Sequence, residues 1–306
     1  MHRGFSDYIV IALKGIAMGA ADAVPGVSGG TIAFISGIYQ ELINTISSIN
    51  LGLFKTLKKE GSLAFWKQCN GNFILTLLSG ILISYVSFMR LAKYLIENHP
   101  ILIWSFFFGL IVASIFFVAR QIKLWNLAVL VSLILGTLGA YYITTIPTMA
   151  GNEHPLFLFF AGAIAICAMI LPGISGSFIL VILGAYKTLS DALHDFDIKK
   201  VALFAFGALI GIVSFSHVLK WLFKHYHDIT LALLTGFIFG SLNRIWPWKE
   251  VLTWREDSSG ELVPFLEKSI SPSSFDGNPQ LALAIALMVI GFVTIFILEK
   301  LGSKKT

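Results

Sequence analysis

Two short segments of the chain carry the residue types that could bind an anion. They read PGVSGGTI at residues 25–32 and PGISGSFI at residues 172–179. Proline stops a helix and glycine permits tight turns, so each segment predicts a break followed by the start of a new helix. The first amides of a helix lack partners and carry the positive end of its dipole, and hydroxyl groups add further donors. We therefore expect the breaks to bind a phosphate group. The candidate phosphate-binding residues in the two breaks are Pro25, Gly26, Ser28, Gly29, Gly30, Thr31, Pro172, Gly173, Ser175, Gly176 and Ser177.

Charged residues within apolar segments add three further candidates. Arg90 is expected to assist an anion, since a guanidinium holds phosphate bidentately. Asp22 and Glu41 are candidates for ion coupling, because an ion at membrane depth costs about 2.5–3.5 kcal/mol and is retained for pairing or function. At an offset of 147 residues they align with Met169 and Thr188, so the acids occur in the first half only. The alternative interpretation of the breaks is that small residues simply allow close helix packing.

The composition predicts a polytopic membrane protein. Of 306 residues, 56% are apolar and only 13% are charged, and the net charge is 22 − 17 = +5. This excludes a disordered chain, a soluble globule and a nucleic-acid-binding protein with a basic face. Cys69 and Cys167 form no disulfide framework or thiolate metal site, and we predict no cofactor. Lys14 interrupts the first apolar run, which argues against a cleavable signal.

Ten apolar segments follow one another along the chain. They are approximately Tyr8–Val24, Thr31–Ile49, Phe73–Leu95, Ile101–Ala119, Leu127–Ile146, Leu156–Leu171, Phe178–Leu189, Val201–Phe223, Thr230–Ile245 and Leu281–Leu298. A crossing needs about 20 residues, and the ninth reaches that length only with Trp246 and Trp248 as interfacial anchors. The first two segments, and the sixth and seventh, are each separated by a break. We expect each of these pairs to be re-entrant, entering and leaving on one side.

The two breaks belong to an internal duplication. Residues 25–42 match residues 172–189 at an offset of 147, and residues 86–114 match residues 213–241 at an offset of 127. The predicted fold is all-α, with a first repeat at residues 1–150 and a second at 151–306 within one integral membrane domain. Each repeat holds five segments, and because five is odd the repeats should be inverted. Inverted repeats with broken helices are typical of transporters.

The loops indicate the orientation. Loops on the side of the N-terminus hold 11 Lys and Arg residues against 7 on the other side, which predicts that both termini are cytoplasmic. Arg120 and Arg244 close their helices, and we expect them to set only the topology. The stretch Arg244–Gln280 is expected to be a long loop.

The residues around the breaks resemble a known family. GIAMGAADAVPGVSGGTIAFISGIYQELI (residues 15–43) and ILPGISGSFILVILGAY (residues 170–186) are similar to the bacterial PopT-type polyprenyl-phosphate translocases, formerly domain of unknown function family 368. The resemblance covers nearly the whole chain. It implies a flippase of the bacterial cytoplasmic (inner) membrane that moves undecaprenyl phosphate from the outer to the inner leaflet, recycling the carrier lipid for peptidoglycan. It also implies a site at Asp22 and the break residues.

Two other functions stay open. Membrane lipid-diphosphate phosphatases share a PGxS-type break, but they need an arginine in the break and a cluster of glutamates, and here Gly29 and Gly30 occupy the expected cation positions. We therefore predict that the chain is not an enzyme. A small-anion transporter or channel could use the same helix termini. The expected partners are polyprenyl phosphate and bilayer lipids but no nucleic acid, and the sequence leaves open a homo-oligomer and coupling to protons or sodium.

Overall fold

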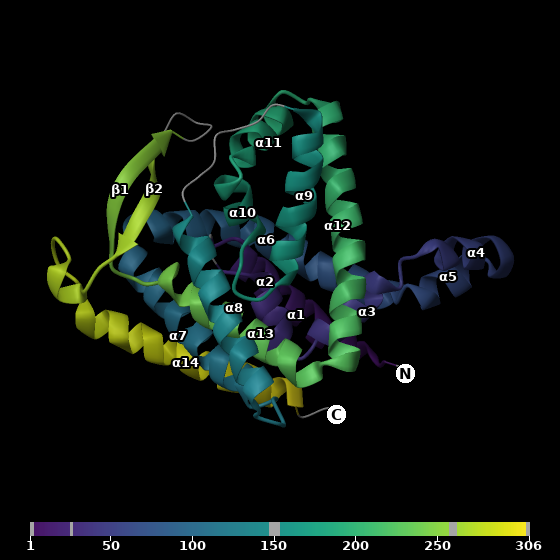
Figure 1. The fold of residues 1–306 in the computed structure, drawn as a ribbon, viewed down its shortest axis with the longest axis horizontal. Helices are drawn as coiled ribbons and strands as arrows, with labels where there is room; N and C mark the ends of the chain where they lie inside the picture. Colours follow the sequence, from purple (N-terminus) through teal and green to yellow (C-terminus); the bar gives the residue numbers. More distant parts are fainter. Residues whose placement is uncertain (1–2, 25–26, 147–153, 257–261, 304–306) are drawn as a thin grey trace.

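The computed structural model describes residues 3–24, 27–146, 154–256 and 262–303 (Figure 1). The first half of the chain forms α1 (Phe5–Asp22), α2 (Gly29–Ile35), α3 (Tyr39–Ser47), α4 (Leu51–Glu60), α5 (Ser62–Gln68), α6 (Gly71–Asn98), α7 (Pro100–Ala119) and α8 (Leu127–Thr145). The second half forms α9 (Pro155–Ile170), α10 (Gly176–Ile182), α11 (Ala185–His194), α12 (Ile198–His225), α13 (His227–Gly240), η1 (Ser241–Asn243), β1 (Lys249–Glu256), β2 (Leu262–Ser269), η2 (Pro272–Ser274) and α14 (Leu281–Ser303).

The helices confirm the prediction of a mostly helical membrane protein. Four of them, α6, α7, α8 and α12, are long and apolar enough to cross a membrane, and α10 with α11 would add a fifth crossing if the bent pair is one span. Large apolar side chains point outward from these helices, among them Leu82 on α6, Leu135 on α8 and Leu209 on α12. Such extended apolar surface marks contact with another apolar phase, which here is lipid.

The stretch after α13 is not a loop, so the prediction of an all-α fold was wrong in this region. β1 and β2 form an antiparallel hairpin with Lys249 opposite Ser269, and Figure 1 shows it standing on the side of the molecule opposite to α4 and α5. Trp248 is buried and donates from Nε1 to the carbonyl of Pro279 at 3.0 Å. The tryptophan therefore packs inside the protein, against Ile101 and Ala284, and does not act as an interfacial anchor.

Each apolar segment after a break is bent a second time, which the sequence analysis missed. Gly37 separates α2 from α3 with a φ of 74°, and Gly184 separates α10 from α11 with a φ of 70°. Glycine tolerates this left-handed backbone because it has no Cβ. The angle between α10 and α11 is 108°. Helix bounds also recur along the chain: α10 begins and ends 147 residues after α2, and α12 begins and ends 127 residues after α6.

Helices from the two halves interlock through glycine contacts. The largest helix contacts are those of α8 with α13, α1 with α6, α7 with α14 and α9 with α12. Two of these four pairs join the first half to the second. At the α8–α13 crossing, a Cβ added to Gly136 would collide with the carbonyl oxygen of Leu233. At the α7–α14 crossing, a Cβ on Gly109 would collide with the carbonyl oxygen of Met288.

Replacing Gly136 with alanine should destabilise the fold, because the backbone of α13 already occupies the space that the new methyl group would need. Overpacking of this kind costs about 1–3 kcal/mol. Gly139 lies one turn further along the same helix, and a Cβ there would meet only the Phe237 ring at 3.8 Å. We expect Gly136→Ala to lower the melting temperature in detergent and Gly139→Ala to leave it near that of the unmodified protein. Equal melting temperatures for the two variants would contradict the crossing geometry.

Candidate site at the paired helix breaks

The two breaks lie against each other, although about 140 residues separate them in the chain. Ser28 is oriented so that its hydroxyl donates to the carbonyls of Met169 (3.3 Å) and Leu171 (3.4 Å). In the reverse direction, the amide of Gly173 donates to Oγ1 of Thr31 at 3.0 Å. Ser28 and Thr31 are both buried. Pro25 and Gly26 lie outside the described residues.

The first break is closed by its own side chains, in contrast to the expectation of free amides. The amide of Gly29 donates to Oδ1 of Asp22 at 2.7 Å, and the amide of Gly30 donates to Oγ of Ser28 at 3.1 Å. The amide of Thr31 donates to the carbonyl of Ser28 at 3.0 Å. A Cβ on Gly29 would overlap the Asp22 carboxylate, which would then have to shift away from the Gly29 amide. Asp22 thus occupies the place that a bound anion would take.

The second break lacks this internal anion. Met169 stands where the first break has Asp22, and Ser175 accepts no capping hydrogen bond from α10. The hydroxyls of Ser175 and Ser177 lie 2.8 Å apart, and Ser177 is exposed. Gly173 has a φ of 88°, and its Cα packs so closely on α13 that a Cβ would lie 2.8 Å from the Phe237 carbonyl oxygen. This break therefore keeps hydroxyl groups available.

Buried glycines fix the packing of both breaks. A Cβ on Gly30 would lie 2.7 Å from the Ile170 carbonyl oxygen, and one on Gly176 would lie 2.8 Å from the Ala165 carbonyl oxygen. Pro172, two residues after the end of α9, is also buried. These small residues allow the helix ends to approach the neighbouring backbone closely, as the packing interpretation requires. Only part of the predicted site therefore has free polar groups.

Arg244 is a site residue that the sequence analysis missed. It lines a cavity of about 10 Å³ beside the second break, together with Gly173, Ser175 and Phe178. Its guanidinium lies over the Phe178 ring at 4.9 Å and pairs through Nη1 with Oε2 of Glu267 at 3.2 Å. Arg244 lies 65 or more residues after the break in sequence, and no spacing signal places it there.

The β-hairpin holds Arg244 in position. Glu267 on β2 accepts from Arg244 and also pairs with Nζ of Lys249 on β1 at 3.3 Å. Lys249 lies over the Trp104 ring at 4.4 Å. Burial lowers the pKa of Lys249 to about 8, and the nearby Glu267 offsets part of this effect. The hairpin thus supplies one carboxylate that is shared by two partly buried cations.

The other predicted charged residues lie in different surroundings. Arg90 is exposed on α6 and forms no hydrogen bond or ion pair with another described residue. Glu41 pairs with Arg3 at 2.6 Å and accepts from Nδ2 of Asn70 at 2.8 Å. Its partners are thus at the start of the chain and at the start of α6. Lys14 donates to the carbonyl of Ser36, at the end of α2.

The model of the VCA0040-like family, described as undecaprenyl phosphate translocase-like, matches residues 18–263. A polyprenyl-phosphate transporter of Vibrio cholerae is 46% identical over 302 residues, covering 97% of this chain and 98% of the relative. A polyprenyl-phosphate transporter of Staphylococcus aureus is 32% identical over 254 residues, covering 77% and 85%. No solved structure matches.

The chain belongs to the undecaprenyl phosphate translocase-like family. The family match contains both breaks, Arg244 and β1. The resemblance seen in the two break motifs is therefore confirmed over most of the chain. The names of the two relatives describe transporters of a lipid phosphate, and the multi-pass helical fold fits proteins of that kind.

Removing the Asp22 carboxylate should destabilise the first break. In Asp22→Ala the amide of Gly29 loses its acceptor in a buried place, at an expected cost of about 1–3 kcal/mol. Asp22→Asn keeps an oxygen acceptor of the same reach and should retain most of the stability. Thermal unfolding of the purified variants in detergent measures the difference. An Asp22→Ala protein as stable as Asp22→Asn would show that the hydrogen bond to Gly29 contributes nothing.

Proposed function

We propose that the protein translocates undecaprenyl phosphate across the bacterial cytoplasmic membrane, from the outer to the inner leaflet, and so recycles the carrier lipid for peptidoglycan synthesis. The observation that carries this proposal is the second break, where Ser175 lines a small cavity together with Arg244 and its hydroxyl lies 2.8 Å from that of Ser177. It occurs in a chain that is 46% identical to a polyprenyl-phosphate transporter. The same observation supports binding without catalysis, so the proposal is a transporter and not an enzyme.

The phosphate site is proposed at the second break. A phosphate monoester carries about −1.5 to −2 charge, which cannot enter hydrocarbon without a compensating group. Arg244 supplies a bidentate donor, and Ser175 and Ser177 supply hydroxyls. The Asp22 carboxylate makes the first break unsuited to a second anion. In this assignment Arg244 takes the role that the sequence analysis gave to Arg90.

Access to this site requires a movement of the protein. The cavity of about 10 Å³ has room for a single water at most. An arriving phosphate would compete with Glu267 for the guanidinium of Arg244, and the hairpin that carries Glu267 would then be free to shift. The very long isoprenoid tail would stay in lipid while the headgroup moves through the protein.

The arrangement of the two halves supports alternating access between inverted repeats. α3 packs along α12, whereas the corresponding pair, α11 and α6, forms no comparable contact in the described part of the chain. Under the proposed inverted symmetry, the structure is one of two conformations of the transporter. In the other conformation α11 would pack along α6 and α3 would separate from α12, which would open the protein to the opposite side of the membrane. With both termini in the cytoplasm, as the loop charges predict, one conformation faces each leaflet.

Transport in proteoliposomes tests the proposal. Vesicles loaded with polyprenyl phosphate would be assayed for the rate at which the lipid phosphate becomes accessible to an impermeant phosphatase. We expect Arg244→Gln to lower this rate by about tenfold or more, because the variant loses a charge-assisted hydrogen bond to the lipid phosphate. Arg120→Gln, the control, should leave the rate unchanged. Glu267→Gln breaks the same ion pair but keeps the guanidinium, and should retain transport. Wild-type protein that moves no lipid phosphate would refute the function.

The same preparations separate the rival functions. Phosphate release from a lipid diphosphate by the protein alone would indicate a phosphatase. Uptake of inorganic phosphate, with no effect of a prenyl phosphate, would indicate a small-anion transporter or channel. We expect neither activity.

Asp22 is the stronger of the two coupling candidates. Glu41 is compensated by Arg3, whereas Asp22 has only the Gly29 amide as partner among the described residues. If protons or sodium drive transport through Asp22, then Asp22→Asn should abolish the dependence of the rate on pH or sodium, and Glu41→Gln should retain it. Wild-type transport that is the same across pH and sodium gradients would remove this role.

A further inference from the structure

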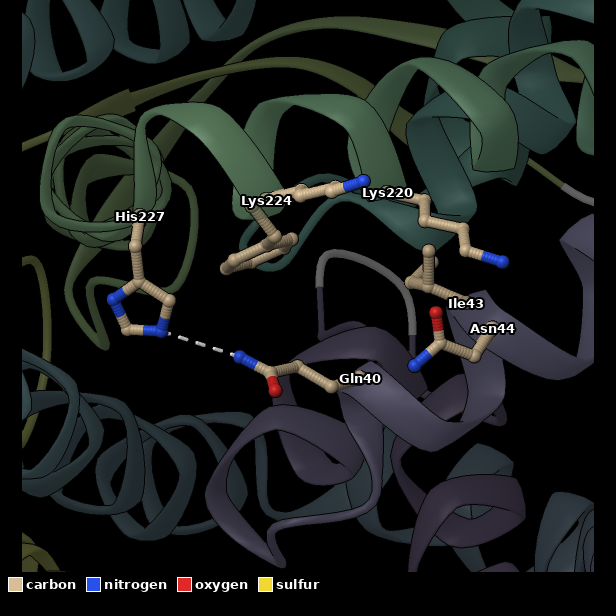
Figure 2. Close-up of a pocket in the computed structure, with 7 residues that line it drawn as sticks. Gln40, Ile43, Asn44, Lys220, Lys224 and His227 are labelled. Atoms are coloured by element: carbon tan, nitrogen blue, oxygen red, sulfur yellow. Dashed lines mark hydrogen bonds between the residues drawn. The ribbon is translucent and has the colours of Figure 1, made fainter.

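A second basic site lies away from the breaks, in a pocket between α3 and the junction of α12 with α13. The pocket has a volume of about 280 Å³. Figure 2 shows Gln40 and Asn44 of α3 on one side and Lys220, Lys224 and His227 on the other. Ile43 and Phe223 complete the lining. Its size is near the lower end for ligand pockets, which suits a headgroup and not a whole lipid.

The two lysines of this pocket carry charges that no described carboxylate compensates. Neither Lys220 nor Lys224 forms an ion pair with any residue that the structure describes. His227 is held through Nδ1 by Oδ1 of Asp228 at 3.3 Å, and its Nε2 lies 3.3 Å from Nε2 of Gln40. The Asp228 carboxylate also accepts from the amide of Leu124 at 2.9 Å, so it is engaged outside the pocket. The pocket therefore presents cations and amides, which together suit an anion.

Aromatic residues place the pocket at the membrane surface. Trp221 and Tyr226 flank Lys224 on the same helix end, and both are about half exposed. Tryptophan and tyrosine concentrate at the membrane–water interface, and lysines there extend toward the headgroups. In the orientation predicted from the loop charges, this end of α12 is cytoplasmic.

The corresponding position in the first half is built differently. At the offset of 127 residues, Lys93 and Glu97 stand where α12 has Lys220 and Lys224. Lys93 and Glu97 form an ion pair of 3.6 Å on α6. On α6, therefore, a glutamate compensates the charge of the lysine. At the matching position on α12, a second lysine doubles the positive charge.

We propose that the pocket between α3 and α12 docks a phosphate monoester headgroup of a prenyl lipid at the cytoplasmic membrane surface, with Lys220 and Lys224 as its cationic ligands. Gln40 and Asn44 would donate from the opposite wall. The inference rests on the proposed function in taking the cargo to be a lipid phosphate. It adds a second binding station, separate from Arg244 and the breaks, on the side where the lipid leaves the protein.

Binding of farnesyl phosphate to the full-length protein in detergent tests the proposal. We expect the double variant Lys220→Gln/Lys224→Gln to raise the Kd by about tenfold or more. Lys220→Arg/Lys224→Arg should retain binding because it keeps both charges. Lys93→Gln, the matched change on α6, should leave the Kd unchanged. The lysines are exposed, and melting temperatures equal to that of the wild type would show that the folds are intact.

Competition distinguishes the source of the phosphate. Excess farnesol should not displace farnesyl phosphate, and inorganic phosphate should compete only weakly if the prenyl chain contributes. Inorganic phosphate that binds as tightly as farnesyl phosphate, with the same loss in the double variant, would make this a free-anion site and overturn the lipid assignment. An unchanged Kd in the double variant would overturn the site itself. An unchanged Kd would not overturn the proposed function as long as vesicles with the wild-type protein still translocate the lipid.

Discussion

A backbone that breaks inside a membrane must find its hydrogen-bond partners within the protein, because lipid offers none. The breaks after α1 and α9 meet this requirement by bonding to each other. Ser28 donates to the carbonyls at the end of α9, and the Gly173 amide donates to Thr31. An unsatisfied amide in hydrocarbon costs several kcal/mol, so separating the breaks requires replacement partners. The seven-residue helices α2 and α10 are too short to be stable alone, and they pack mainly against α1 and α9, the helices that precede them.

The two breaks have nearly the same sequence but carry different local charge, because the residues that set this charge lie outside the shared motif. Asp22 places a negative charge at the Gly29 amide, and its counterpart Met169 places none at the second break. Arg244 then brings a positive charge to the second break from beyond α13. The first break is therefore complete without a ligand, whereas the second has hydroxyl groups and an arginine whose carboxylate partner, Glu267, is shared with Lys249. In the proposed transporter, one break is structural and the other binds the headgroup.

The long helices and the breaks were predictable from the sequence, because length in apolar residues and the effect of Pro-Gly on a helix are local properties. The expected segment Val201–Phe223 lies within α12, and both breaks fall where they were expected. The bends at Gly37 and Gly184 were missed, since a single glycine in an apolar run is usually tolerated within a helix. The position of Arg244 could not be read from sequence, because it depends on how α13 and the hairpin pack against a break in another part of the chain. The β-hairpin was missed because its strands mix charged and apolar residues without strict alternation.

A difference in charge between the two ends of the protein does not by itself give transport a direction. A basic pocket on one side lowers the free energy of the lipid bound there, but it slows the release of the headgroup as much as it favours its arrival. At equilibrium such a carrier distributes the lipid according to the two leaflets alone, since a protein that is unchanged by a cycle cannot shift the end states. Net movement to the inner leaflet therefore needs either consumption of the lipid phosphate on that side or a coupled ion. Asp22, a carboxylate at the junction of the breaks without a cation beside it among the described residues, is the group through which an ion could act on the conformational change.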